Sequence, residues 1–313
     1  IDAGYKVGSN SAADACTFQK LSCGIKATRA AGNHTISVQR SNFTGNTVGI
    51  ITQNVNTAKI VNNTFTLHKP ARRNLGFGLI VYTGTGYNIQ KNTFIGNNVA
   101  NKTEIGIWVN NTGPDNNSIY NNTFTKLDYA NLALGDNRND PLNPDAMGLH
   151  YECNTHTQGL YDMYIAGGNG IRLFQNGILG GTQSAQNTYS RNGTSESDYY
   201  IPSGLPVTPC YDNALLQTQA LDFTTEWFTQ VQGDISNPNT CPDQSQQISG
   251  LAQPARQVLA NSFTQAETDY GNTLYLYNAL IDNGNTNALL DNIDLVWSND
   301  AWTLRNQLVA KSP

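Results

Sequence analysis

An asparagine-threonine-aromatic triplet returns at nearly regular intervals along the first two-thirds of this 313-residue chain. The copies are Asn63-Thr64-Phe65, Asn92-Thr93-Phe94, Asn122-Thr123-Phe124, Asn154-Thr155-His156 and Asn187-Thr188-Tyr189, with Ser41-Asn42-Phe43 as an earlier degenerate copy. The position of the aromatic or His residue advances by 22, 29, 30, 32 and 33 residues. Such a near-constant period indicates stacked repeats, and it restricts the fold more than any local signal.

Each copy also carries the signals of short strands. An apolar residue precedes the aromatic by five positions, and a run rich in Val, Ile and Thr follows it, often opened by Gly. The shortest repeat, 22 residues, is too short for a strand and a helix but accommodates three short strands and three turns. The sequence therefore predicts a mainly β chain with a right-handed parallel β-helix over residues 1–195.

In such a solenoid, equivalent positions of successive coils lie above one another. We expect the Phe positions to form an internal aromatic stack, each ring contributing roughly 1.5–3 kcal/mol of burial. We expect the Asn positions to lie at the bends, where their amides bond freed backbone groups and the amides of neighbouring coils. We therefore interpret the repeated Asn residues as architecture.

The pattern changes after residue 195. Residues 196–250 hold five prolines and little periodicity, which predicts an extended, disulfide-pinned connector. Over residues 251–313, apolar residues at a 3-4 spacing, such as Phe263, Tyr270 and Tyr277, predict short amphipathic helices. These helices cannot be stable alone, so they must pack on something, and we expect the helical segment to continue in a longer chain.

Composition restricts the partners. Only 13% of the residues are charged and the net charge is −5, without a sustained basic run, so nucleic acid is not an expected partner. No apolar stretch approaches the length of a membrane span, so membrane insertion is not expected.

Five cysteines suggest an oxidising setting. We expect disulfides Cys16–Cys23 and Cys210–Cys241, with Cys153 left free. The competing interpretation is five free thiols in a cytosolic protein. The spacings resemble no zinc site.

Alternation along the Gly-opened strands predicts an outer apolar column. We expect Ile50, Thr52, Leu79, Val81, Ile107, Val109, Leu132, Leu134, Met163 and Ile165 inside, and Ile51, Ile80, Trp108, Ala133 and Tyr164 outside. An apolar column of this size needs a cover, either the C-terminal segment or the rest of a longer chain. The functional alternative is a binding groove formed by Ile51, Ile80, Trp108 and Tyr164, in which the two aromatic residues stack on sugars.

The sequence contains no complete catalytic or metal motif. Residues 135–145 form an oxygen-rich segment in which Asp136, Asp140 and Asp145 are candidate Ca²⁺ ligands, although an ordinary Asx- and Pro-stabilised loop explains it as well. If the chain is an enzyme, Asp140, His150 and Glu152 are the candidate acid-base residues. No cofactor other than Ca²⁺ is suggested.

Several segments carry a resemblance to a known group. They are residues 148–154 (Gly-Leu-His-Tyr-Glu-Cys-Asn), Ile201-Pro202, Pro209-Cys210-Tyr211 and, in the tail, residues 276–282 and 301–306. In these segments the chain resembles the large secreted right-handed β-helix proteins of Bacteroidota, which often carry a type IX secretion sorting domain. The resemblance implies an exported, multi-module protein at the cell surface or outside the cell, and it implies no defined reaction.

Two functions fit these observations. The first is a structural or adhesive module, an adhesin-like part of a large surface or extracellular assembly whose partners are other modules of that assembly. The second is a carbohydrate-active β-helix enzyme, of the polysaccharide lyase or hydrolase type, or a glycan-binding module.

Overall fold

The computed structural model describes residues 5–8, 15–29, 35–67, 75–97, 103–138, 147–177, 183–190, 197–202, 205–212, 218–221, 223, 228–233 and 241. The chain divides into two compact units, Ile1–Cys241 and Pro242–Pro313. The helices predicted over residues 251–313 lie outside the described residues. Among the described residues, no helix is long and apolar enough to cross a membrane.

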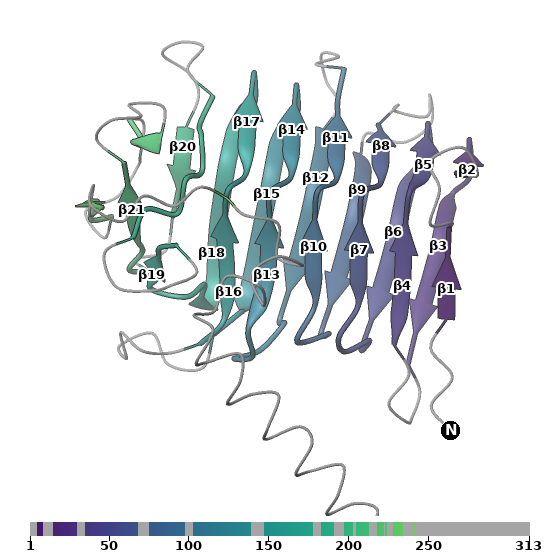
Figure 1. The fold of residues 1–313 in the computed structure, drawn as a ribbon, viewed down its shortest axis with the longest axis horizontal. Coiled ribbons are helices and arrows are strands. Elements are labelled where there is room, and N and C mark those ends of the chain that lie inside the picture. Colours follow the sequence, from purple (N-terminus) through teal and green to yellow (C-terminus); the bar gives the residue numbers. More distant parts are fainter. Residues whose placement is uncertain are drawn as a thin grey trace, which may run out of the picture. The chain divides into compact units, whose positions relative to one another are not determined.

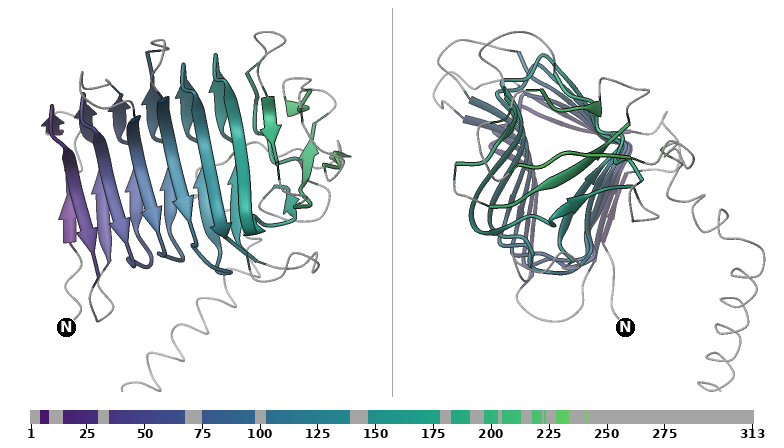
Figure 2. Two further views of the ribbon diagram at one scale, coloured as in Figure 1. Left: turned by 180° about the vertical axis from the view of Figure 1, so that it is seen from behind. Right: turned by 90° about the vertical axis from the view of Figure 1, so that its left-hand side faces the viewer.

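Six successive coils of the first unit each contribute one strand to each of three parallel sheets. Within a sheet, the strands of successive coils lie side by side along the stack (Figure 1). Sheet A contains β1 (Tyr5–Val7), β4 (Ile36–Gln39), β7 (Lys59–Val61), β10 (Asn88–Gln90), β13 (Asn117–Tyr120) and β16 (Leu149–Glu152). Sheet B contains β2 (Cys16–Gln19), β5 (Ser41–Thr44), β8 (Thr64–Thr66), β11 (Thr93–Ile95), β14 (Thr123–Thr125) and β17 (Thr155–Thr157). Sheet C contains β3 (Cys23–Thr28), β6 (Val48–Gln53), β9 (Leu75–Tyr82), β12 (Thr103–Asn110), β15 (Tyr129–Asp136), β18 (Tyr161–Gly170) and β20 (Ser197–Tyr200). The view along the stack shows the strands surrounding one central core (Figure 2), and the predicted parallel β-helix is confirmed.

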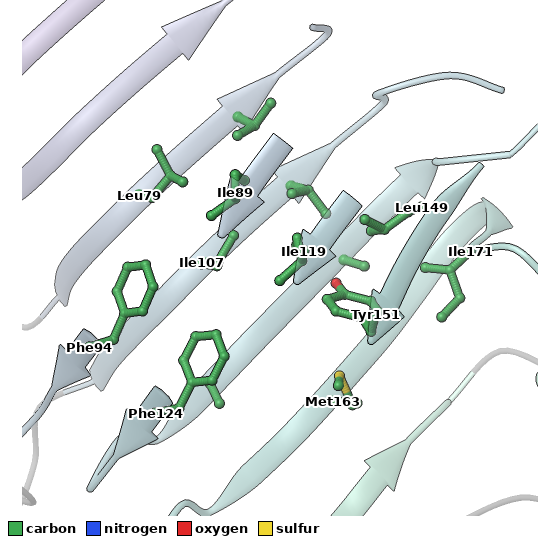
Figure 3. Close-up of a cluster of buried hydrophobic side chains, with 14 of the residues drawn as sticks. Leu79, Ile89, Phe94, Ile107, Ile119, Phe124, Leu149, Tyr151, Met163 and Ile171 are labelled. Carbon is green, nitrogen blue, oxygen red and sulfur yellow. The ribbon is translucent and has the colours of Figure 1, made fainter. Parts of the chain in front are cut away.

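The aromatic stack runs through the core as predicted. Phe43, Phe65, Phe94 and Phe124 occupy the same register position on consecutive strands of sheet B, and His156 continues the series. The centroids of neighbouring rings are 4.6 to 5.1 Å apart and their planes are within 9° of parallel. Figure 3 shows Phe94 and Phe124 on successive coils, beside the aliphatic side chains that fill the rest of the core.

The asparagine ladder is equally regular. The Oδ1 atom of Asn122 accepts hydrogen bonds from the backbone N (2.9 Å) and from Nδ2 (3.0 Å) of Asn92. Its own Nδ2 donates to the carbonyl of Ile89 (2.9 Å) and to Oδ1 of Asn154 (3.0 Å). The ladder asparagines do not have left-handed backbone conformations. The positive φ angle belongs to the residue that precedes each of them, for example Asn121 (51°) before Asn122.

Parallel pairing continues past residue 195, where we expected the β-helix to end. Strand β20 pairs with β18, and a small fourth sheet contains β19 (Phe174–Gln175), β21 (Thr208–Tyr211) and β22 (Val231–Gln232). Residues 197–232 therefore add paired strands within the segment that we expected to be an irregular connector.

The predicted disulfide pairs are wrong. Cys153 bonds to Cys241, with 5.7 Å between their Cα atoms, and Cys16, Cys23 and Cys210 are free thiols. Cys16 and Cys23 are close in sequence but belong to different sheets, where Cys16 aligns with Ser41 and Cys23 with Val48. Cys153 occupies a left-handed corner after β16 (φ 59°), and the chain returns to this corner at Cys241.

The predicted alternation fails on one strand. On β15 the inward residues are Asn131 and Ala133, both buried, whereas Leu132 and Leu134 face outward and are partly exposed. Asn131 aligns with the inward Ile107, and its Nδ2 lies 3.0 Å from Nε2 of His156. The polar Asn is inside because the His in the aromatic stack gives it a partner.

Candidate contact face

One column of partly exposed apolar side chains runs along the outer face of sheet C. Each member aligns in register with the next over six consecutive strands, in the order Ile51, Ile80, Trp108, Leu132, Tyr164 and Tyr200. Four of these residues were predicted to form a binding surface. Leu132 takes the place predicted for Ala133, which is buried at 1% exposure.

A second column lies beside the first, three residues earlier on each strand. It contains Phe77, Ile105, Tyr129 and Tyr161, which align in register. Phe77, Tyr129 and Tyr161 are partly exposed, whereas Ile105 is buried at 5% exposure. The residues between the two columns are buried, and on β9 and β12 the first of them is a glycine. A Cβ atom at Gly78 would be 2.6 Å from Cδ1 of Phe94 and 2.6 Å from the carbonyl oxygen of Gly106. We call the two columns together the outer aromatic face.

Four tyrosines cluster on the last three strands of the outer aromatic face, β15, β18 and β20. The rings of Tyr129 and Tyr161 stack at 5.0 Å and 23°, and those of Tyr164 and Tyr200 at 4.8 Å and 27°. The two pairs meet nearly at right angles, at 71° between Tyr129 and Tyr164 and 87° between Tyr161 and Tyr164. Because rings at these spacings cover one another's faces, the cluster presents mainly ring edges and hydroxyl groups outward.

Two tyrosines of the cluster, Tyr129 and Tyr164, have a raised pKa. Burial is the main cause that raises the pKa of Tyr129, followed by the neighbouring Tyr161, Tyr164 and the Asp128 carboxylate. Burial also raises the pKa of Tyr164, with Tyr200 and Tyr161 adding to the effect. A raised phenol pKa keeps the hydroxyl protonated at neutral pH, so Tyr129 and Tyr164 can each donate and accept hydrogen bonds.

His150 and Glu152 lie on the other side of the molecule, on β16 of sheet A. His150 Nε2 donates to the carbonyl of Asn176 (2.6 Å), and burial, with a smaller effect of Arg172, lowers the pKa of His150 to about 4. Glu152 is 2% exposed, and its charge partly offsets the effect of burial on the Arg172 pKa. A carboxylate buried to this degree is not presented to a substrate.

The structure does not bring together the predicted calcium ligands. Asp136 is exposed, and its Oδ1 accepts a hydrogen bond from the backbone N of Asn169 at 2.8 Å. Asp140 and Asp145 lie outside the described residues. Within the ranges that the structure describes, no three His, Cys, Asp or Glu side chains are grouped closely enough to hold a metal ion.

Sequence reasoning missed Tyr129, Tyr161 and Tyr200, and it missed Leu132 as an outward residue. One signal was present, since Tyr129 and Tyr161 each follow the core aromatic of their coil, Phe124 and His156, by five positions. Aligning the copies on that offset would have placed both tyrosines in one column.

Comparison with known proteins gives one match. Residues 4–140 match the family described as "Periplasmic copper-binding protein (NosD)". No curated protein and no solved structure matches the chain.

The described residues do not fit a copper site. Both ring nitrogens of His156 are occupied, since Nδ1 donates to the Thr188 carbonyl (2.7 Å) and Nε2 accepts from Asn131 Nδ2 (3.0 Å). His150 Nε2 donates to the Asn176 carbonyl, burial raises the pKa of the Cys210 thiol to about 11, and no three His, Cys, Asp or Glu side chains are grouped within the described ranges. The chain is a parallel β-helix protein whose residues 4–140 are similar to the NosD family.

Proposed function

We propose that this chain is a structural module of an exported or envelope protein, a stiff stack of coils that holds the outer aromatic face ready for contact with another macromolecule. The observation that carries the proposal is that face itself. It is apolar and partly exposed over six strands of one sheet. Monomeric proteins rarely expose a contiguous apolar patch of this extent, and such patches mark interaction sites.

The stiffness of the module follows from its ladders. Asn63, Asn92, Asn122, Asn154 and Asn187 are each at most 2% exposed and are joined in an unbroken series of hydrogen bonds. Since each amide uses both its oxygen and its nitrogen across neighbouring coils, no coil can rotate without breaking several buried bonds. A rigid platform of this kind lowers the entropy cost of binding.

Two observations support a location outside the cytoplasm. The Cys153–Cys241 disulfide is typical of proteins in oxidising compartments. The matching family is described as periplasmic. Placement at the cell surface, type IX secretion and an origin in Bacteroidota rest on the sequence resemblance alone and remain part of the proposal.

Glycan binding is the second candidate, favoured by the aromatic content of the face. Tyrosine and tryptophan are residues on which sugars stack. The rings of the clustered tyrosines, however, stack on one another, and Trp108 stacks on Phe77 with centroids 5.6 Å apart. This arrangement leaves edges and hydroxyl groups for contact, which suits a protein surface better than a sugar ring.

The test combines a glycan array with assays for released reducing ends and unsaturated sugars on a panel of polysaccharides. The proposed function predicts no sugar release by the folded chain. Release that disappears in Glu152→Gln, with the circular dichroism spectrum unchanged, would show an enzyme instead. Array binding that disappears in Trp108→Ala, with no release, would favour the glycan-binding alternative.

A further inference from the structure

We infer that the partner of the outer aromatic face is a second copy of this chain, an inference that rests on the proposed function of the face as a contact surface. Three properties of the described residues carry it: the size of the face, its lack of charge and the chemistry of its hydroxyl groups.

The size of the face fits a weak, reversible interface. The first column spans six strands, about 29 Å, the second spans four strands, about 19 Å, and together they cover four residues along a strand, about 13 Å. Because these residues are at most partly exposed, two such faces would bury less than about 1,000 Å² in total, which is the range of transient interfaces. The structure therefore predicts a reversible dimer of modest affinity.

The lack of charge favours self-association over other pairings. In a two-fold symmetric dimer the same patch of both copies is in contact, so a charge on the patch lies close to the same charge of the other copy and is repelled by it. The aligned residues of both columns are aliphatic or aromatic, whereas the whole chain carries a net charge of −5. Lys26 on β3 aligns with Ile51 and borders the first column, so like charges are confined to one end of the outer aromatic face, and two copies can approach over the rest of it without like-charge repulsion.

The tyrosine hydroxyls make the face complementary to itself. A protonated phenol donates one hydrogen bond and accepts others, so Tyr164 and Tyr200 of one copy can bond the same residues of the other. Lys, Arg, Asp and Glu, which only donate or only accept when charged, lack this property. Tyr and Trp are also the residues most enriched where binding energy is concentrated in interfaces.

Sedimentation velocity over a broad concentration range, with the oxidised chain, tests the inference. The wild type should show a monomer–dimer equilibrium. Leu132→Glu places two like charges at the centre of the dimer and should raise the dissociation constant by about tenfold or more. Tyr164→Ala, which adds no charge, should weaken the dimer in the same direction. Thr157→Glu introduces the same charge at an exposed site on β17 of sheet B and should leave the dimer unchanged.

A wild-type chain that stays monomeric at every concentration overturns the inference, as does a dimer that Leu132→Glu and Thr157→Glu weaken equally. A monomer whose Trp108 fluorescence responds to an oligosaccharide also overturns it and identifies a glycan as the occupant. The proposed function is tested independently of this inference. Sugar release in the turnover assay would contradict it, whether the chain is a monomer or a dimer.

Discussion

Replacing Asn122 by Ala should destabilise the fold strongly, because this side chain serves two neighbouring coils at once. The substitution removes the acceptor of the Asn92 backbone N–H and of one Asn92 Nδ2 hydrogen, and the Nδ2 donor to the Ile89 carbonyl. Asn122 is 1% exposed, so water cannot replace these partners without entering the core.

The size of the effect follows from those lost partners. A buried polar group that loses its partner costs about 1–3 kcal/mol, and two to three groups are affected. We therefore expect a loss of about 4 kcal/mol in the free energy of unfolding. For a unit of this size that corresponds to a fall in Tm of roughly 8–16 °C.

Thermal unfolding followed by far-UV circular dichroism measures this change directly. The matched control is Asn42→Ala, because Asn42 lies on β5 of sheet B with its side chain exposed. Its effect should be within about 0.5 kcal/mol. If Asn122→Ala unfolds within about 1 kcal/mol of the wild type, as the control does, the amide ladder does not hold the coils together and the reasoning is refuted.

Three further predictions concern other parts of the stack. Burial lowers the pKa of His156 from 6.5 to about 4, so the folded state favours the neutral ring. The contribution of this ring to stability should be full above pH 6.5 and should be lost as the pH drops towards 4. A plot of Tm against pH should therefore fall less over this range in His156→Phe than in the wild type. Cys241→Ser opens a disulfide of sequence separation 88 and should cost about 4–5 kcal/mol in urea unfolding, whereas Cys16→Ser should change little because a serine occupies that register position in the next coil. Gly78→Ala places a Cβ 2.6 Å from the Phe94 ring and should lower stability by about 1–3 kcal/mol in the same thermal assay; an unchanged Tm would contradict the inward position of this glycine.

The parts of the fold that could be predicted are those in which the same residue recurs at each coil. Phe94 and Asn92 have counterparts one period away in both directions, so their alignment identifies the core stack and the amide ladder without any structure. Parallel in-register pairing then follows, because identical residues gain most from lying above one another.

The rest depends on contacts that sequence spacing does not contain. The frame of β15 could not be predicted because Leu132 and Leu134 are more apolar than the inward Asn131. The buried Nδ2 of Asn131 has two partners from other coils, His156 Nε2 and the Asp162 carbonyl, which sequence spacing does not reveal. The disulfide joins Cys153 to a residue 88 positions later, and proximity in sequence favoured a different pair.

The outward position of part of the first column was predicted, and most of the tyrosine cluster was missed. Ile80, Trp108 and Tyr164 were assigned to the outer column from alternation alone. Tyr129 and Tyr161 were not, since two consecutive buried residues separate each of them from the first column, Ala130 and Asn131 on β15 and Asp162 and Met163 on β18, and this breaks the two-residue alternation.

Oxidative footprinting of the outer aromatic face tests the central claim most directly. Hydroxyl radicals would be applied to the chain in dilute solution and again in its native extracellular or envelope setting, with labelling of Trp108, Tyr164 and Tyr200 read by mass spectrometry. A contact face should be labelled in dilute solution and protected in the assembled state, while Tyr5, at 68% exposure on β1, is labelled in both. Equal labelling of all four residues in the two states would show that the face stays open, and would contradict the account.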